Sequence, residues 1–279
     1  MRWFIYLWIF IFMISCASNA LNKKKEAEIH FRLGDSYLRQ GKPGFALREL
    51  VQAQKLDPQN PDIYLDLGLA YMARGDLDKA EAQFKKSIQL NPEYGAAYNN
   101  LGLLYLRQKK LREAERCFKK AISIYVYPTP EVAYTNLGSC YILQKKYSEA
   151  QNAFRHAIEV NLLYLPAYLG LGRTWEIQKQ YDRALDVYQE GIQYLPEEAT
   201  LYYRIALIYF LKGEKEKAKE YFKRVIQLDQ GGLRQHAQKN VERPSMIAKR
   251  AQEMPPFLVM DVLERAQILE KTGRKYYPS

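Results

Sequence analysis

The stretch that decides the fold is residues 61–94, PDIYLDLGLAYMARGDLDKAEAQFKKSIQLNPEY. It has a small residue at its eighth position, an aromatic at its eleventh, an alanine at its twentieth and an aromatic at its twenty-fourth. With Pro61 as position 1, equivalent units begin at residues 27, 95, 131, 165 and 199, so the period is 34 residues except for one unit of 36. Such a period is typical of a repeat protein.

The recurring positions keep their residue types along the chain. Position 8 holds Gly34, Gly68, Gly102, Gly138, Gly172 and Ala206. Position 11 holds Tyr37, Tyr71, Tyr105, Tyr141, Trp175 and Tyr209. Position 20 holds Ala46, Ala80, Ala114, Ala150, Ala184 and Ala218. Position 24 holds Leu50, Phe84, Phe118, Phe154, Tyr188 and Phe222.

These spacings predict a helical hairpin in each unit. Positions 4, 7, 8 and 11 lie on one face of a first helix, and positions 20, 24 and 27 lie on one face of a second. Small residues at positions 8 and 20 let the helices approach closely, while the aromatics fill the space beside them. Pro58, Pro92 and Pro196 at position 32 end the second helix. Because one hairpin cannot bury its apolar face alone, we expect the hairpins to stack into a solenoid.

This pattern resembles the tetratricopeptide repeat family over residues 27–232. The resemblance implies an all-α fold, a right-handed superhelical solenoid of six tetratricopeptide repeats, to which the residues after the repeats are expected to add a C-terminal helical cap. The predicted repeats are residues 27–60, 61–94, 95–130, 131–164, 165–198 and 199–232. Members of the family are scaffolds whose concave face receives a partner's peptide or helix, so the resemblance names no reaction.

Residues 233–279 depart from the repeat and are predicted to form a C-terminal helical extension. An apolar stripe at helical spacing in this segment comprises Leu258, Val262, Leu263, Ala266 and Leu269. The stripe ends near Gly273, a typical helix stop. We expect the extension to cover the exposed end of the solenoid. A helix that docks a partner is the alternative interpretation of the same stripe.

The chain begins with an apolar run at residues 3–14, WFIYLWIFIFMI. As a helix this run would reach about 18 Å, which is short of the roughly 30 Å hydrocarbon core of a bilayer. The run and the small residues after it therefore predict a signal peptide at residues 1–15.

The residues Met13-Ile14-Ser15-Cys16 resemble the lipobox of bacterial lipoprotein signals. The resemblance implies cleavage before Cys16, attachment of acyl chains such as palmitate to Cys16, and a lipidated tether at residues 16–26. Because each buried methylene adds about 0.8 kcal/mol, three acyl chains would anchor the protein without a membrane-spanning helix. Ala17 implies sorting to the outer membrane, with the protein facing the periplasm. An export signal with an unmodified Cys16 is the alternative.

Composition and motifs argue against several function classes. The formal net charge of +11 is scattered along the chain, whereas a nucleic-acid site would need clustered Lys and Arg beside a reading motif. We find no Gly-rich phosphate loop, no His-Glu-x-x-His run and no serine nucleophile elbow. We therefore expect no catalytic residue, no metal, no cofactor, no nucleic-acid partner and no small-molecule substrate. An enzyme whose site lies in residues 233–279 is an alternative, but that segment lacks convergent acid–base residues.

The histidines and the other two cysteines have structural interpretations. His30, His156 and His236 are far apart in sequence, and His30 occupies packing position 4. Cys117 and Cys140 lie in neighbouring repeats, where an oxidising compartment would permit a disulfide. Small buried thiols fit such packing equally well, and we favour two free thiols.

By resemblance to the family, positions 2, 5, 9, 12 and 13 face the concave side. This candidate partner groove comprises Leu65, Leu69, Met72, Asn99, Leu103, Leu106, Thr135, Ile142 and Leu143. Phe31 and Asp35 stand where chaperone-binding members carry the Lys and Asn that clamp a terminal carboxylate. Aliphatic residues suit an apolar partner segment instead. The alternative is that neighbouring repeats or the tail cover some of these residues.

The period slips by two residues at Tyr127-Pro128-Thr129-Pro130, where the prolines are expected to lengthen the turn. With the lipobox and about six repeats, this segment resembles that of the outer-membrane lipoproteins that assist type IV pilus biogenesis, the PilF/PilW-like secretin pilotins. The residues that extend the resemblance are Tyr134, Asn136, Gly138 and Cys140. The resemblance implies that the protein helps a secretin reach the outer membrane or multimerise. A generic repeat lipoprotein that scaffolds cell-wall enzymes or another envelope complex is the alternative.

Overall fold

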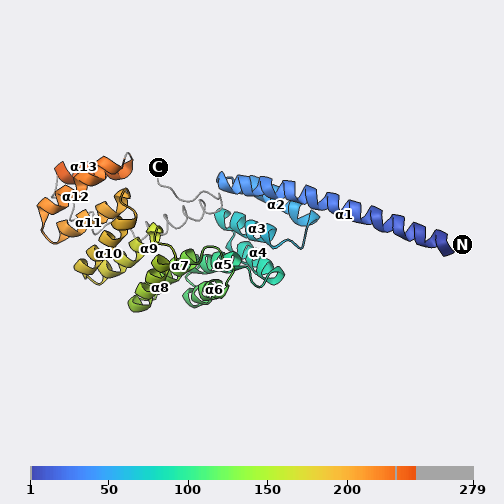
Figure 1. The fold of residues 1–279 in the computed structure, drawn as a ribbon, viewed down its shortest axis with the longest axis horizontal. Helices are drawn as coiled ribbons and strands as arrows, with labels where there is room; N and C mark the ends of the chain where they lie inside the picture. Colours follow the sequence, from blue (N-terminus) through green and yellow to red (C-terminus); the bar gives the residue numbers. More distant parts are fainter. Residues whose placement is uncertain (1, 230, 243–279) are drawn as a thin grey trace. The chain divides into compact units, whose positions relative to one another are not determined.

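A computed structural model of the chain describes residues 2–229 and 231–242, with side chains for residues 21–229 and 231–241. Within these residues the fold consists of thirteen α-helices and contains no strand (Figure 1). The expected all-α fold of stacked helical hairpins is confirmed.

The first six helices are α1 (Arg2–Arg39), α2 (Pro43–Leu56), α3 (Pro61–Arg74), α4 (Leu77–Leu90), α5 (Gly95–Arg107) and α6 (Leu111–Ser123). The next six are α7 (Pro130–Leu143), α8 (Tyr147–Val160), α9 (Leu165–Ile177), α10 (Tyr181–Tyr194), α11 (Ala199–Leu211) and α12 (Lys215–Leu228). The last described helix is α13 (Gly232–Glu242).

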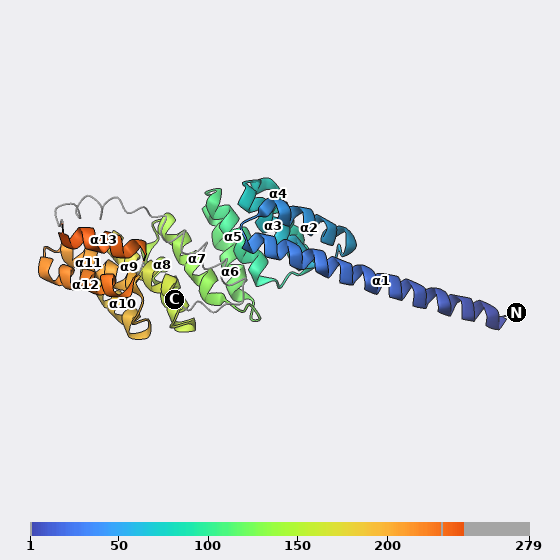
Figure 2. The ribbon, with the colours of Figure 1, turned by 90° about the horizontal axis from the view of Figure 1, so that it is seen from above.

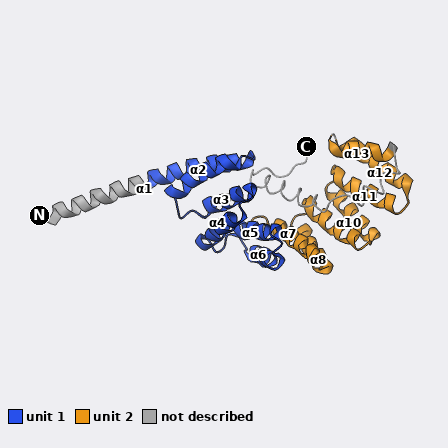
Figure 3. Ribbon diagram, turned by 180° about the vertical axis from the view of Figure 1, so that it is seen from behind, with its two compact units in different colours: residues 1–127 blue, residues 128–279 orange. Residues whose placement is uncertain are grey.

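The chain divides into two compact units (Figure 3). Unit 1 is Met1–Tyr127, in which α1 pairs with α2, α3 with α4 and α5 with α6. Unit 2 is Pro128–Ser279, in which α7 pairs with α8, α9 with α10 and α11 with α12. Each unit therefore contains three consecutive hairpins.

Each hairpin closes on the small and aromatic residues that the period predicts. A Cβ atom on Gly138 would lie 2.8 Å from Cζ of Phe154, and one on Gly102 would lie 2.6 Å from Cε1 of Phe118. The six alanines at position 20 are at most 2% exposed, and the five aromatics at position 24 are at most 1% exposed. Because a Cβ atom at Gly102 or Gly138 would clash with the aromatic ring of the paired helix, the predicted close approach is confirmed.

Tyrosines at position 4 fix the turn that precedes their own helix. Their hydroxyl groups donate hydrogen bonds to backbone carbonyls six residues earlier, in the turn that joins one hairpin to the next. The bonds run from Tyr64 to Pro58 (3.0 Å), from Tyr168 to Leu162 (3.1 Å) and from Tyr202 to Pro196 (3.0 Å). These bonds satisfy carbonyls at the end of the second helix, where intrahelical partners run out.

The turn inside each hairpin contains a left-handed residue at position 15. Glycine fills it in three hairpins, as Gly41 (φ 68°), Gly75 (φ 84°) and Gly213 (φ 81°). Lysine fills it in the other three, as Lys109 (φ 60°), Lys145 (φ 60°) and Lys179 (φ 58°). A residue with a Cβ atom adopts this conformation at a cost of about 1 kcal/mol, so these lysines are not explained by the turn itself.

The two-residue slip lengthens a turn, as predicted. Residues 124–129 separate α6 from α7, whereas residues 91–94 separate α4 from α5. Pro130 stands in the first turn of α7, a position that needs no N–H donor. Tyr127 is 7% exposed, and its ring occupies the space beside Gly95. The boundary between the two compact units falls between Tyr127 and Pro128.

Helix α13 covers the last hairpin of unit 2 (Figure 2). Its Ala237 is fully buried in a cluster with Phe222 and Val225, and Leu233 and Val241 pack on the same cluster. The expected cap is thus formed by the first residues of the extension. The predicted stripe from Leu258 to Leu269 lies outside the described residues.

At the N-terminus, α1 extends well past its partner α2 (Figure 1). The helix is continuous through residues 16–26, the predicted tether. The side chain of Cys16 is outside the described part, so the signal peptide and the lipidation remain predictions. None of the helices in the part of the chain described with side chains is both long enough and apolar enough to span a membrane.

Candidate interaction surfaces

Unit 1 contains six of the nine residues predicted to line a partner groove. Three of them are buried: Leu65 (5% exposed), Asn99 (3%) and Leu106 (5%). The other three, Leu69, Met72 and Leu103, are half-buried. The buried three stabilise the stack of hairpins, and the half-buried three present the accessible part of the predicted set in this unit.

Unit 2 contains the remaining three predicted residues. Thr135 is fully buried, Ile142 is half-buried and Leu143 is 57% exposed. Leu143 is therefore the most accessible of the nine. The role of this set as a partner groove remains a prediction, since burial alone does not identify a bound segment.

A second apolar surface lies on the first helix of the first repeat. Ile29 is 61% exposed and Leu33 is 44% exposed, at positions 3 and 7 of their repeat. The residues at the same two positions of the second repeat, Ile63 and Leu67, are 0% and 1% exposed. We call Ile29 and Leu33 the open face of repeat 1.

The contrast has a simple cause. Ile63 and Leu67 belong to a buried cluster with Leu47, Leu50 and Ala53, which α2 of the preceding hairpin supplies. Positions 3 and 7 are buried in all later repeats as well. Within the described residues no hairpin stands before the first repeat, so Ile29 and Leu33 lack the contact that α2 makes with Ile63 and Leu67.

Ion pairs border the open face. Glu28 pairs with Arg32 at 2.5 Å, and Asp35 pairs with Arg39 at 2.6 Å, each across one helical turn. The exposed residues 23–25 are all lysines. The charges beside Ile29 and Leu33 therefore balance, while the three lysines make the N-terminal end of the open face basic. This charge distribution suits an apolar partner segment with an acidic end.

A half-buried pair ties the first two helices together. Nδ1 of His30 lies 2.8 Å from Oε2 of Glu49, and Arg48 also contacts the Glu49 carboxylate. The hydrogen bond with His30, with help from Arg48, holds the pKa of Glu49 below its ordinary value of 4.5, although burial opposes the shift. His30 thus has the structural role expected from its position.

We expect Glu49→Gln to remove part of the acid sensitivity of the fold. A carboxyl with a lowered pKa contributes stability above its unfolded pKa and loses that contribution as the pH falls through the folded value. The variant should be less stable at pH 7 by less than about 1 kcal/mol, and the difference should shrink as the pH falls through the lowered pKa of Glu49. Urea denaturation at pH 7 and at a series of acidic pH values measures this. Glu159→Gln is the matched control, because Glu159 pairs with His156 at an exposed site; an equal effect there would contradict the assignment.

Three exposed aliphatic side chains recur at position 13 in unit 2. They are Leu143 (57% exposed), Ile177 (38%) and Leu211 (44%), in the last turns of α7, α9 and α11. Lysines follow within three residues of each, and we call this set the aliphatic–lysine edge of unit 2.

A buried charged network joins α9, α10 and α11. The guanidinium of Arg204 pairs with Oε2 of Glu176, and the Tyr188 hydroxyl donates to Oε1 of Glu176 at 2.6 Å. Burial and the nearby carboxylate raise the pKa of Tyr188, so this hydroxyl keeps its proton. Glu176 occupies position 12, which the family resemblance assigns to the concave side, but here it serves the packing of three helices.

The described cysteines are free thiols, as favoured from the sequence. Cys140 is buried and Cys117 is half-buried. Burial raises the pKa of Cys117 to about 11, so its thiol is a poor nucleophile at neutral pH. Among the described residues, His, Cys, Asp and Glu form no group of three that could hold a metal ion.

Sequence patterns alone missed the open face of repeat 1. Ile29 and Leu33 fit the repeat as well as their buried equivalents, so residue type does not distinguish them. The available signal was their place in the first unit, which has no preceding hairpin.

Sequence profiles described as tetratricopeptide repeat match most of the chain. The matched residues are 27–60, 60–125, 93–162, 135–193 and 199–231. A comparison with curated protein sequences gave no match.

Several solved structures are similar to this chain. The structure of pilF from Pseudomonas aeruginosa is 20% identical with a TM-score of 0.63, over 76% of this chain and 96% of that one. PilW, a widely conserved type IV pilus biogenesis factor, is 24% identical with a TM-score of 0.63, over 71% and 91%. MamA is 29% identical with a TM-score of 0.50, over 59% and 95%. At these identities the two pilus proteins support a shared fold.

Proposed function

Since the chain belongs to the tetratricopeptide repeat family, we propose that it is an outer-membrane lipoprotein that assists type IV pilus biogenesis. In this role it acts as a protein-interaction scaffold that supports the localisation or multimerisation of a secretin. Tetratricopeptide repeats generally serve as protein-interaction modules, and no catalytic family is indicated.

The observation that carries the scaffold role is the open face of repeat 1. Ile29 and Leu33 are exposed at positions that are buried in the five later repeats, and in the second repeat these positions pack against α2. At the equivalent positions of the second repeat, aliphatic residues pack against a helix. The exposed aliphatic residues of the first repeat therefore favour binding of an amphipathic partner helix. Helix α1 rises about 1.5 Å per residue, so this face lies about 20 Å along the helix from Cys16.

The pilus role has a different support. The chain shares its fold with pilF of Pseudomonas aeruginosa and with PilW over more than nine-tenths of each of those chains. Its sequence also carries the lipobox-like residues that end at Cys16 and the Tyr-Pro insertion at Tyr127-Pro128. The combination favours a pilus lipoprotein over a generic envelope scaffold, because the insertion has no role in the repeat period itself.

Deletion of the gene in the native bacterium should reduce detergent-resistant secretin multimers and surface pili. Cys16→Ala should reduce both by releasing the protein from the membrane. The double variant Ile29→Asp and Leu33→Asp should keep membrane attachment and lose multimers, because carboxylates on the open face oppose an apolar partner. Immunoblots of unheated envelope fractions measure the multimers.

The matched control is Leu162→Asp with Leu163→Asp, which places two carboxylates at exposed aliphatic residues of unit 2. This control should retain multimers. Unchanged multimers and piliation in the deletion strain would refute the pilus role. Recovery of cell-wall hydrolases and no secretin with the purified protein would favour the generic scaffold instead.

A further inference from the structure

The aliphatic–lysine edge of unit 2 is not explained by the repeat fold. In unit 1, position 13 holds Arg39, Ala73 and Arg107, in turns with the same left-handed residue two positions later. The hairpin therefore forms without a large apolar side chain at this position. In unit 2 the same position holds Leu143, Ile177 and Leu211, each more than one-third exposed. Exposed aliphatic residues in three successive repeats favour a contact surface.

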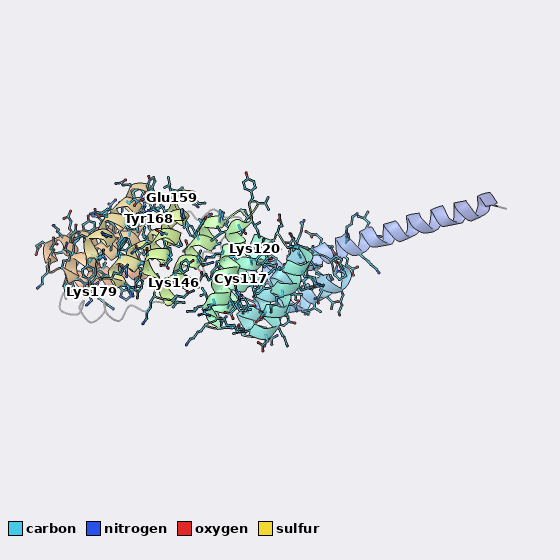
Figure 4. All side chains as sticks on the ribbon, turned by 90° about the horizontal axis from the view of Figure 1, so that it is seen from below. Cys117, Lys120, Lys146, Glu159, Tyr168 and Lys179 are labelled. Atoms are coloured by element: carbon cyan, nitrogen blue, oxygen red, sulfur yellow. The ribbon has the colours of Figure 1, made fainter. Side chains whose placement is uncertain are left out.

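Cations accompany each aliphatic side chain. The lysines that follow them are Lys145, Lys146, Lys179 and Lys212, all exposed. Lys146 also lies 5.5 Å from the centroid of the Tyr141 ring, and Lys212 pairs with Asp182 and Glu214. Figure 4 shows Lys146 and Lys179 along one edge of unit 2, with Glu159 along the opposite edge. Leu143 and Ile177 thus have a basic border, whereas the lysine beside Leu211 is paired with two carboxylates.

Two of these lysines are held in an unfavourable backbone conformation. Lys145 and Lys179 have φ values of 60° and 58°, whereas the equivalent Gly213 of the next repeat has a φ of 81°. Glycine adopts the left-handed region without the clash that a Cβ atom brings. The turn would accept glycine at all three places, so the turn itself does not require these lysine side chains.

We propose that this edge binds the surface of an anionic lipid bilayer. The aliphatic side chains enter the acyl boundary, and the lysines contact lipid phosphates through long stems that reach the headgroup layer. A bilayer offers the same apolar layer beneath the same phosphate layer to all three repeats. A peptide would need an acidic–apolar pair repeated at the spacing of the hairpins, so three equivalent points favour the bilayer.

The proposed contact is independent of the proposed pilus role and of the acylation of Cys16. It would orient unit 2 against a membrane through its own side chains. A lipid anchor, if present, would raise the local concentration of this edge at the bilayer without replacing its contacts.

A local fluorescent reporter tests the proposal in the full chain. Gln180 and Glu197 are both exposed. Gln180 lies in a turn at the lysine edge, and Glu197 lies in a turn at the opposite edge. A polarity-sensitive dye is attached at Gln180→Cys or Glu197→Cys, with Cys16 and Cys117 replaced by Ser. Vesicles contain either phosphatidylcholine alone or phosphatidylcholine with phosphatidylglycerol.

The dye at residue 180 should shift to the blue with phosphatidylglycerol vesicles and not with phosphatidylcholine alone. The dye at residue 197 should stay in water in both. Replacing Leu143, Ile177 and Leu211 with Asn should weaken the response about tenfold or more, because each side chain loses its apolar area. The matched control replaces Val160, Leu162 and Leu163 with Asn on the opposite edge and should respond like the parent.

A second variant separates lipid contact from folding. Lys145→Gly with Lys179→Gly removes two cations and relieves two left-handed conformations, so its thermal midpoint should not fall. Its response should nevertheless weaken several-fold and become less sensitive to salt. An unshifted dye at residue 180, an equal loss in the opposite-edge control, or an unchanged response in both the aliphatic and the lysine variants would overturn the proposal.

Discussion

Replacing Phe154 with Ala is expected to lower the free energy of unfolding by about 4 kcal/mol. Phe154 lies in α8 and is fully buried. A Cβ atom on Gly138 of α7 would lie 2.8 Å from its ring, and one on Gly170 of α9 would lie closer still. The ring therefore fills the contact within its own hairpin and the contact with the next hairpin, and the two glycines leave no side chain that could close the cavity.

Urea denaturation followed by far-ultraviolet circular dichroism measures this loss. In a repeat protein each hairpin depends on its neighbours, so we also expect a lower m-value if α9 and the following helices unfold separately from the rest. Phe45→Ala is the matched control. Phe45 is 53% exposed and stacks beside Tyr37, so its loss should be less than about 1 kcal/mol. A similar loss in both variants would contradict the central position of Phe154.

The contact around Phe154 could be predicted from the sequence because it repeats. A small residue at position 8 and a large apolar residue at position 24 recur at a fixed distance, and only a hairpin brings both to one place in every unit. The lengthened turn could be predicted for the same reason, since two extra residues interrupt a strict period at Tyr127. A repeated pattern supplies several tests of the same interpretation, which a single motif does not.

The candidate surfaces were harder to predict because exposure depends on neighbours. Leu65 and Leu143 were assigned to the same concave surface, yet Leu65 is 5% exposed and Leu143 is 57% exposed. The period gives the face of the helix on which a residue lies, but it does not give the depth to which adjacent elements cover it. Ile29 shows the converse case, since its residue type indicates a core position and its place at the first repeat leaves it open.

The buried network around Arg204 was not predictable for another reason. Arg204 and Glu176 are 28 residues apart, and neither position is charged in every repeat. A charged residue inside a regular helix is usually solvated, so the residue pattern does not indicate a buried pair. The pair is visible only when α9, α10 and α11 are packed together.

Arg204→Met is expected to destabilise the protein by about 2–3 kcal/mol. Arg204 has a side chain that is 10% exposed, and its partner Glu176 has one that is 13% exposed. Methionine fills a similar volume, so the loss comes mainly from the Glu176 carboxylate, which keeps only the more exposed Arg173, 3.4 Å from its Oε2, as a cation. Arg234→Met serves as a control for the change of residue type, because Arg234 is half-buried on α13 outside this network. Urea denaturation at pH 7 compares the two variants.

The network also predicts a rescue. Adding Glu176→Leu to Arg204→Met removes the carboxylate that has lost its buried cation and should restore part of the lost stability, since apolar residues of similar size often replace a buried ion pair without loss. The rescue should be incomplete, because the Tyr188 hydroxyl then lacks the acceptor to which it donates at 2.6 Å. Tyr188→Phe as a third change should recover about 1 kcal/mol more of the free energy of unfolding. If Glu176→Leu lowers stability further in the Arg204→Met background, the cost of the single variant does not arise from the weaker pairing of the Glu176 carboxylate.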